Sequence, residues 1–166
     1  IDSIVEHYSI PQWFEGAPSL IHSSQIQSNK FILPDEEHIL VSKLNPSTHK
    51  IWKIEKNLDE NLTRIASTEW CVIVPKKAIP IDYVIFIVNS FEFRFTMKSY
   101  VTGTTNSHQR VKSNDLLGFK IPNVEHSDME RIANITAIYE NKINNMHREC
   151  KTLKELGNAI FKSIFG

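Results

Sequence analysis

The feature that most constrains this chain is a regular apolar pattern over residues 127–164. Apolar residues recur there at alternating intervals of three and four, which is typical of a long helix that pairs with another helix. Such a helix would span about 57 Å, whereas the ~130 residues before it would form a globule only about 30–40 Å across. We therefore expect a helical partner outside the globular part. The pattern consists of Met129, Ile132, Thr136, Tyr139, Ile143, Met146, Cys150, Leu153, Gly157, Ile160 and Ile164.

The sequence also predicts where this helix begins and which residues carry its contact. Ser127 and Glu130 have the spacing of a capping box, so the helix is expected to begin there. We divide the chain into a globular domain, residues 1–122, and a spacer or dimerisation helix, residues 123–166. The alternative is a C-terminal helix that packs only on its own domain. The contact is assigned to Ile132, Tyr139, Ile143, Met146, Leu153 and Ile160.

The globular part is expected to be α+β and rich in strands. One helix is predicted over residues 81–100, with an apolar stripe of Val84, Val88, Phe91 and Phe95. Asp115 is expected to cap a short helical turn. Residues 11–18 and 56–64 are expected to be a turn and a polar loop, and residues 19–30 to be irregular. Short apolar runs between turn residues predict strands over residues 1–10, 31–33, 39–44, 51–54, 70–74 and 119–122.

The chain has no net charge, with 19 basic and 19 acidic side chains, but two segments are basic. Residues 42–56 contain four lysines and one glutamate, and residues 94–112 contain four cations and no acid. Basic segments of a neutral chain can form a one-sided patch if the fold brings them together. The alternative is two ordinary solvated surfaces.

Sequence signatures of catalysis are missing. The five glycines form no phosphate-binding loop, and the seven histidines have no zinc-binding spacing. We expect a non-catalytic protein without cofactor or metal. Cys71 and Cys150 are expected to be buried thiols in a reducing compartment. No apolar run approaches the ~20 residues that cross a bilayer and no signal peptide is visible, so we expect a cytoplasmic protein without membrane contact.

A polar loop over residues 103–112 contains the side chains best suited to bind DNA. Asn and Gln can bond adenine through two hydrogen bonds, Arg can do so with guanine, and Lys suits phosphates. Taken one by one, each of these residues also fits an exposed turn. The sequence does not indicate whether they would enter the major or the minor groove. The loop candidates are Thr104, Thr105, Asn106, Ser107, His108, Gln109, Arg110 and Lys112. The first basic segment adds Ser42, Lys43, Asn45, Lys50 and Lys53.

Four segments give the chain its resemblance to a known family. They are YSIPQWFEGAP (8–18), SNKFILPDEEHILVSKLNPSTHKIW (28–52), STEWCVIVPK (67–76) and GTTNSHQRVKSNDLLGFKIP (103–122). In order and spacing they resemble the target recognition domain of type I restriction–modification specificity subunits. In that family a long helix follows the domain and pairs antiparallel with its twin, a role that residues 127–164 fit. The chain lacks the double proline with which that helix often starts.

The resemblance implies a non-catalytic subunit that binds double-stranded DNA at a specific sequence. It would direct a methyltransferase subunit, and a restriction subunit in the full complex, to a bipartite site. Full specificity subunits have two recognition domains and two such helices, so this chain is expected to be a half subunit that forms a homodimer or one half of a longer chain. Two hypotheses compete: a coiled-coil scaffold whose head binds protein, and an enzyme with a site assembled from scattered residues.

Overall fold

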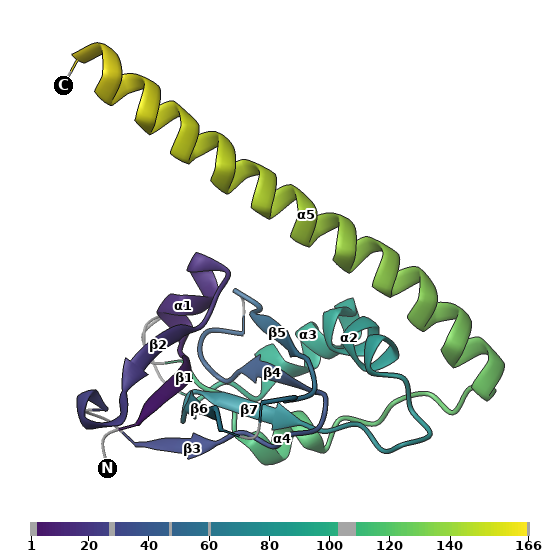
Figure 1. The fold of residues 1–166 in the computed structure, drawn as a ribbon. Coiled ribbons are helices and arrows are strands. Elements are labelled where there is room, and N and C mark those ends of the chain that lie inside the picture. Colours follow the sequence, from purple (N-terminus) through teal and green to yellow (C-terminus); the bar gives the residue numbers. More distant parts are fainter. Residues whose placement is uncertain (1–2, 27–28, 47, 60, 103–108, 166) are drawn as a thin grey trace.

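The computed structural model describes residues 3–26, 29–46, 48–59, 61–102 and 109–165. They form a mixed α+β head and one long helix that rises from it (Figure 1), which confirms the predicted class. The strands are β1 (Ile4–Tyr8), β2 (Ser19–His22), β3 (Lys30–Ile32), β4 (His38–Ser42), β5 (Ile51–Ile54), β6 (Thr63–Ser67) and β7 (Trp70–Ile73). The helices are α1 (Ile10–Glu15), the 3₁₀ helix η1 (Ser23–Gln25), α2 (Ile81–Asn89), α3 (Phe91–Ser99), α4 (Ser113–Leu117) and α5 (His126–Phe165).

The head is built in layers around β4, whose five residues are all buried. One sheet has the order β2-β1-β6-β3 and the other β5-β4-β7; of the strand pairs that the structure describes, β1–β6 is parallel and the others are antiparallel. Because side chains alternate along a strand, Ile39 and Val41 pack toward the helices while Leu40 packs toward the other sheet, with Tyr8 and Trp70. The three-stranded sheet is therefore the middle layer of the head.

The predicted helix over residues 81–100 is two helices, and part of its predicted stripe was wrong. Ser90 has extended backbone angles and its side chain accepts a hydrogen bond from the Phe93 amide, so it ends α2 and caps α3. The break shifts the helical phase. Phe93 and Met97 are buried in the core, whereas Phe91 and Phe95 are 69% and 65% exposed.

Other local predictions need correction. The turn expected at residues 11–18 contains α1, which Ser9 caps. The irregular segment 19–30 contains β2, and β6 includes the end of the expected loop 56–64. No strand forms over residues 119–122. The short helical turn expected near Asp115 is α4, and the Asp115 carboxylate accepts a hydrogen bond from the Lys112 amide at its start.

The long helix is confirmed, although it begins before the predicted capping box. The Asp128 and Met129 amides donate to the Glu125 carbonyl, so Ser127 already lies within the first turn. Near its start α5 packs on α2, where Ala133 contacts the cluster of Tyr83 and Ile87. In this first part α2 covers one side of the helix, so the head partly provides the partner that the sequence placed outside it.

We expect Ala133 to be the most size-sensitive position where α5 joins the head, because its side chain is 6% exposed against Tyr83 and Ile87. Ala133→Leu should overpack this contact and lower the free energy of unfolding by about 1–3 kcal/mol. Thermal unfolding would measure the change. Ala159→Leu, at an exposed position of the same helix, is the matched control, and equal effects of the two changes would contradict this packing.

Candidate nucleic-acid interface

Two segments that are far apart in the chain meet edge to edge at the end of β4. The Asn45 amide donates to the Gln109 carbonyl at 2.9 Å, and the Val111 amide donates to the Lys43 carbonyl at 3.0 Å. Thr102 and Arg110 exchange backbone hydrogen bonds of 3.0 and 3.1 Å. The two basic segments of the sequence are therefore joined at this point, which we call the β4 junction (Lys43–Asn45, Glu69, Thr102 and Gln109–Val111).

The residues after β4 have the local chemistry that a sharp turn requires. The buried Ser42 hydroxyl bonds both the amide and the carbonyl of Leu44, each at 3.1 Å. Asn45 has φ +45°, a left-handed conformation that Asn tolerates better than most residues. The Thr48 amide then donates to the Asn45 carbonyl at 2.8 Å. Ser42 and Asn45 thus shape the junction.

An acidic side chain holds the arginine of the junction. Arg110 Nη2 donates to Glu69 Oε1 at 2.6 Å, and Glu69 lies in the turn between β6 and β7. The Lys43 amide also donates to the Glu69 carbonyl at 2.9 Å. The Arg110 side chain remains 57% exposed, so its other guanidinium donors can reach a ligand. Glu69 can therefore orient Arg110 without covering it.

The structure brings together only some of the predicted DNA-contacting residues. Lys43, Asn45, Gln109 and Arg110 lie at the junction, and the exposed Lys112 precedes α4 directly after it. Five other predicted DNA contacts lie outside the described residues: Thr104, Thr105, Asn106, Ser107 and His108.

Two lysines that were predicted to bind DNA phosphates make other contacts in this structure. Lys50 is 5% exposed, and its ammonium group donates to the Thr48 carbonyl at 3.0 Å. Burial lowers its pKa. Lys53 lies 3.1 Å from Asp82 and 3.4 Å from Glu37, so it ties β5 to α2. Neither lysine belongs to the junction.

The turn between β4 and β5 is fixed to the helical layer by His49. Its ring packs edge-on against Phe93, with centroids 5.9 Å apart, and it hydrogen-bonds the Val88 backbone. Burial is the main cause that lowers the pKa of His49 to about 4; the hydrogen bond with the Val88 backbone acts against it, and the charges of Arg94 and Lys50 act with it. The neutral ring thus holds one side of the junction's turn in place, and Arg94 lies close by.

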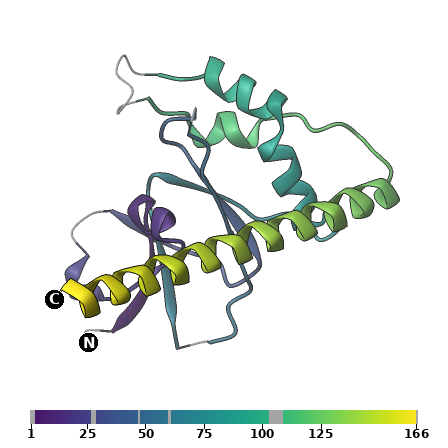
Figure 2. The same ribbon diagram turned by 90° about the horizontal axis from the view of Figure 1, so that it is seen from above.

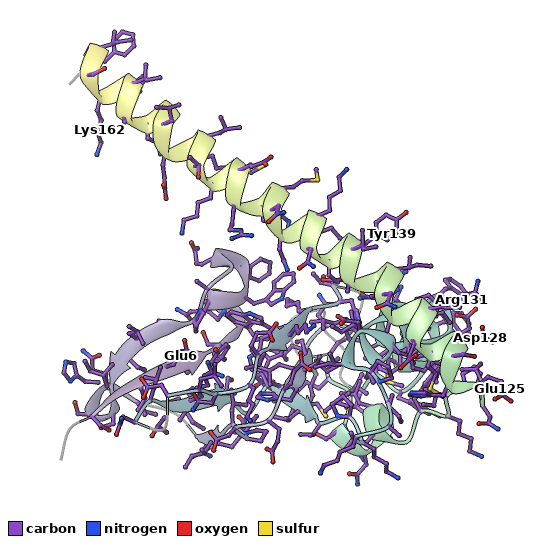
Figure 3. The ribbon with its side chains drawn as sticks, turned by 45° about the vertical axis from the view of Figure 1, so that its right-hand side comes forward. Glu6, Glu125, Asp128, Arg131, Tyr139 and Lys162 are labelled. Carbon is purple, nitrogen blue, oxygen red and sulfur yellow. The ribbon has the colours of Figure 1, made fainter. Side chains whose placement is uncertain are left out.

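The outer part of α5 forms a second candidate surface. Residues 141–165 are all exposed, and Figure 3 shows that this part of the helix rises away from the head. We call the exposed apolar residues on the outer side of the whole of α5, from Ile135 onward, the α5 stripe; in Figure 3 Tyr139 points away from the head. Since a helix turns about 100° per residue, the stripe lies roughly a third of a turn from the face that meets α2. It consists of Ile135, Ile138, Tyr139, Ile143, Met146, Leu153, Leu156, Ile160 and Ile164, each at least 45% exposed.

The exposure of α5 bears on two predictions from the sequence, the helical contact and the burial of the cysteines. Of the six residues assigned to the helical contact, Ile132 packs with Met129 on the α2 side, and the other five belong to the stripe. Cys71 is buried as expected, but Cys150 is exposed, because no residue that the structure describes covers this part of α5.

The sequence did not identify two polar residues of the junction, Glu69 and Thr102, as part of the site. The one available signal was the acid in the tight turn of residues 67–70, which sequence alone could not connect to Arg110. Among the described residues, no group of His, Cys, Asp and Glu side chains could hold a metal ion, and no helix could span a bilayer. No protein-family profile and no curated protein sequence matches the chain.

Proposed function

We propose that the chain is a non-catalytic DNA-specificity module of a type I restriction–modification system. The observation that carries this proposal is the β4 junction, which joins the two basic segments through backbone hydrogen bonds between Lys43–Asn45 and Gln109–Val111. The same segments carry the most specific part of the sequence resemblance. These bonds hold Gln109–Val111 beside Lys43–Asn45, so side chains of both basic segments can contact DNA together.

The junction offers separate groups for reading bases and for binding the backbone. Arg110 can bond guanine through two donors, and Gln109 can bond adenine in the same way. The Glu69 carboxylate accepts a hydrogen bond from the Arg110 guanidinium and can hold it in position. Lys43 suits a phosphate, which sets the position of the protein on DNA but not its sequence preference.

We expect Arg110→Ala to relax the preference for one base pair of the recognised site by about 1–3 kcal/mol. The reason is that a bidentate contact to one base would be lost while phosphate contacts remain. Binding to a panel of duplexes, each with one base pair changed, would measure the effect. Lys43→Ala is the matched control, since it should weaken binding to every duplex equally and reduce the salt dependence. A uniform loss for Arg110→Ala would exclude base readout by this residue.

The α5 stripe supports the second half of the proposal, which is pairing with another recognition half. We propose that two copies, or two halves of a longer chain, pair antiparallel through their outer helices. The paired helices would set the distance between two half-sites on DNA. The assembly would then direct a methyltransferase subunit, and a restriction subunit in the full complex, to the bipartite site.

Mapping of adenine methylation tests this function directly. Cells that carry the chain with its cognate modification subunit would be compared with cells that lack only the chain. A bipartite methylated motif that depends on the chain is expected, and a palindromic motif would indicate a homodimer. If an active modification subunit gave no chain-dependent methylation, the exposed α5 stripe would favour the alternative, a coiled-coil scaffold whose head binds protein.

A further inference from the structure

The outward face of α3 combines two unpaired cations with two exposed aromatic rings. Phe91 and Phe95 stack on each other with centroids 5.8 Å apart and an interplanar angle of 24°. Arg94 and Lys98 are also exposed, and no described acidic side chain pairs with either of them. Residues four apart lie about 6 Å from each other along a helix axis, so the two cations form a short row beside the ring pair.

This face borders the β4 junction. Phe93 and Met97 lie in the core, on the opposite side of α3. The helix ends at Ser99, three residues before Thr102 of the junction, and its Phe93 ring packs against the His49 ring. His49 belongs to the turn that starts at Asn45. In Figure 2 α3 lies beyond α2 and away from α5. The cations of α3 therefore flank the junction and not the helical surface.

The α3 face has the chemistry of a DNA-backbone contact. Its only acid, Glu92, lies about half a turn of the helix away from Arg94, so nothing on the helix neutralises the row. The rings provide an apolar surface that fits the deoxyribose side of a strand, and that would keep water from the neighbouring ion pairs. An acidic protein surface could also bind cations, but the position beside the junction favours DNA.

We propose that α3 is a second DNA-contacting element, in which Arg94 and Lys98 bind phosphates next to the bases that the junction reads and the Phe91–Phe95 pair packs against the sugars. This proposal rests on the proposed DNA-specificity function. It adds a positioning role that is independent of sequence, since phosphate contacts carry no base information.

The test measures how binding of the full chain depends on salt. The probes are a duplex with the methylated motif and a duplex of scrambled sequence. Each lost phosphate contact should reduce the slope of log K against log salt concentration by about 0.9 and weaken binding about 5-fold at 0.15 M salt. Arg94→Gln with Lys98→Gln should therefore reduce the slope by about 1.8 on both duplexes. Phe95→Ala should weaken binding without changing the slope.

Lys151→Gln with Lys162→Gln is the matched control, because it removes two exposed cations from α5 and should leave the slope unchanged. If the α3 double variant binds DNA with the slope of the original chain, the inference is wrong while the proposed function stands. If the original chain itself binds neither duplex, both fail. Equal slope changes in the α3 and α5 double variants would also overturn the inference, because the effect would then reflect total charge.

Discussion

Leu153→Asp is expected to convert a dimer of this chain into a monomer while its head stays folded. Leu153 is 65% exposed at the centre of the free part of α5, so the head does not need it. In a helix pair it would be buried from both copies, and burying a leucine contributes about 1.5–3 kcal/mol. Losing two buried leucines and burying two carboxylates should raise the dimer Kd at least 1000-fold, by about 4 kcal/mol or more. Sedimentation equilibrium over a range of concentrations measures this Kd.

The matched control is Asn158→Asp on the same helix. Asn158 continues the polar side that faces the head, along the line from Glu140 through His147, so its change adds the same charge outside the proposed contact. It should leave the Kd within a few-fold of the original. If Leu153→Asp and the original chain sediment alike, helix pairing through the stripe is excluded. If Asn158→Asp is equally disruptive, the pairing uses a different face.

The long helix could be predicted because its signal is local and repeated. Each turn of α5 adds an apolar residue at the same angular position, and no other element is needed to recognise it. What the periodicity does not reveal is that α2 already covers the first part, because Tyr83 and Ile87 are distant in sequence from Ala133. The free part of the helix is consequently shorter than the pattern indicates.

The errors within the head have the same origin in non-local contacts. β6 has the sequence TRIAS, whose only large apolar residue is Ile65, and it becomes a strand because β1 and β3 pair with it on both sides. The helical break is more local. The apolar residues around Ser90 fit the period of one continuous helix. The helix nevertheless breaks there, because the Ser90 hydroxyl accepts a hydrogen bond from the Phe93 amide and caps a new helix.

The candidate site was predictable in composition but not in assembly. Charge and side-chain type indicate that Lys43 and Lys50 are equivalent, since each is a lysine in the same basic segment. In the structure Lys43 lies at the junction, whereas Lys50 turns inward, with its ammonium group 5.9 Å from the Phe14 ring centroid. Contacts with the Thr48 carbonyl and the Phe14 ring hold Lys50 inward, and these contacts cannot be read from the sequence.

We expect the stability of the chain to depend strongly on pH, because of a histidine in the turn that supports the junction. The His49 pKa is about 4 in the folded chain against 6.5 for a free histidine, so between these pH values only the unfolded state binds the proton. The stabilisation is complete above pH 6.5 and is lost as the pH falls toward 4. It amounts to about 3 kcal/mol. Burial lowers the pKa of His38 and His7 as well, so they add to the loss.

Urea unfolding at a series of pH values from 4 to 8 measures this effect. The original chain should lose most stability below pH 6.5, and His49→Gln should flatten the curve by about one proton between pH 4 and 6.5. His147→Gln, at an exposed position of α5, is the control and should leave the slope unchanged. Because His49 anchors the turn beside Arg94 and Asn45, sequence-specific DNA binding should weaken over the same pH range. An unchanged slope in His49→Gln would mean that His49 is not the group that destabilises this turn in acid.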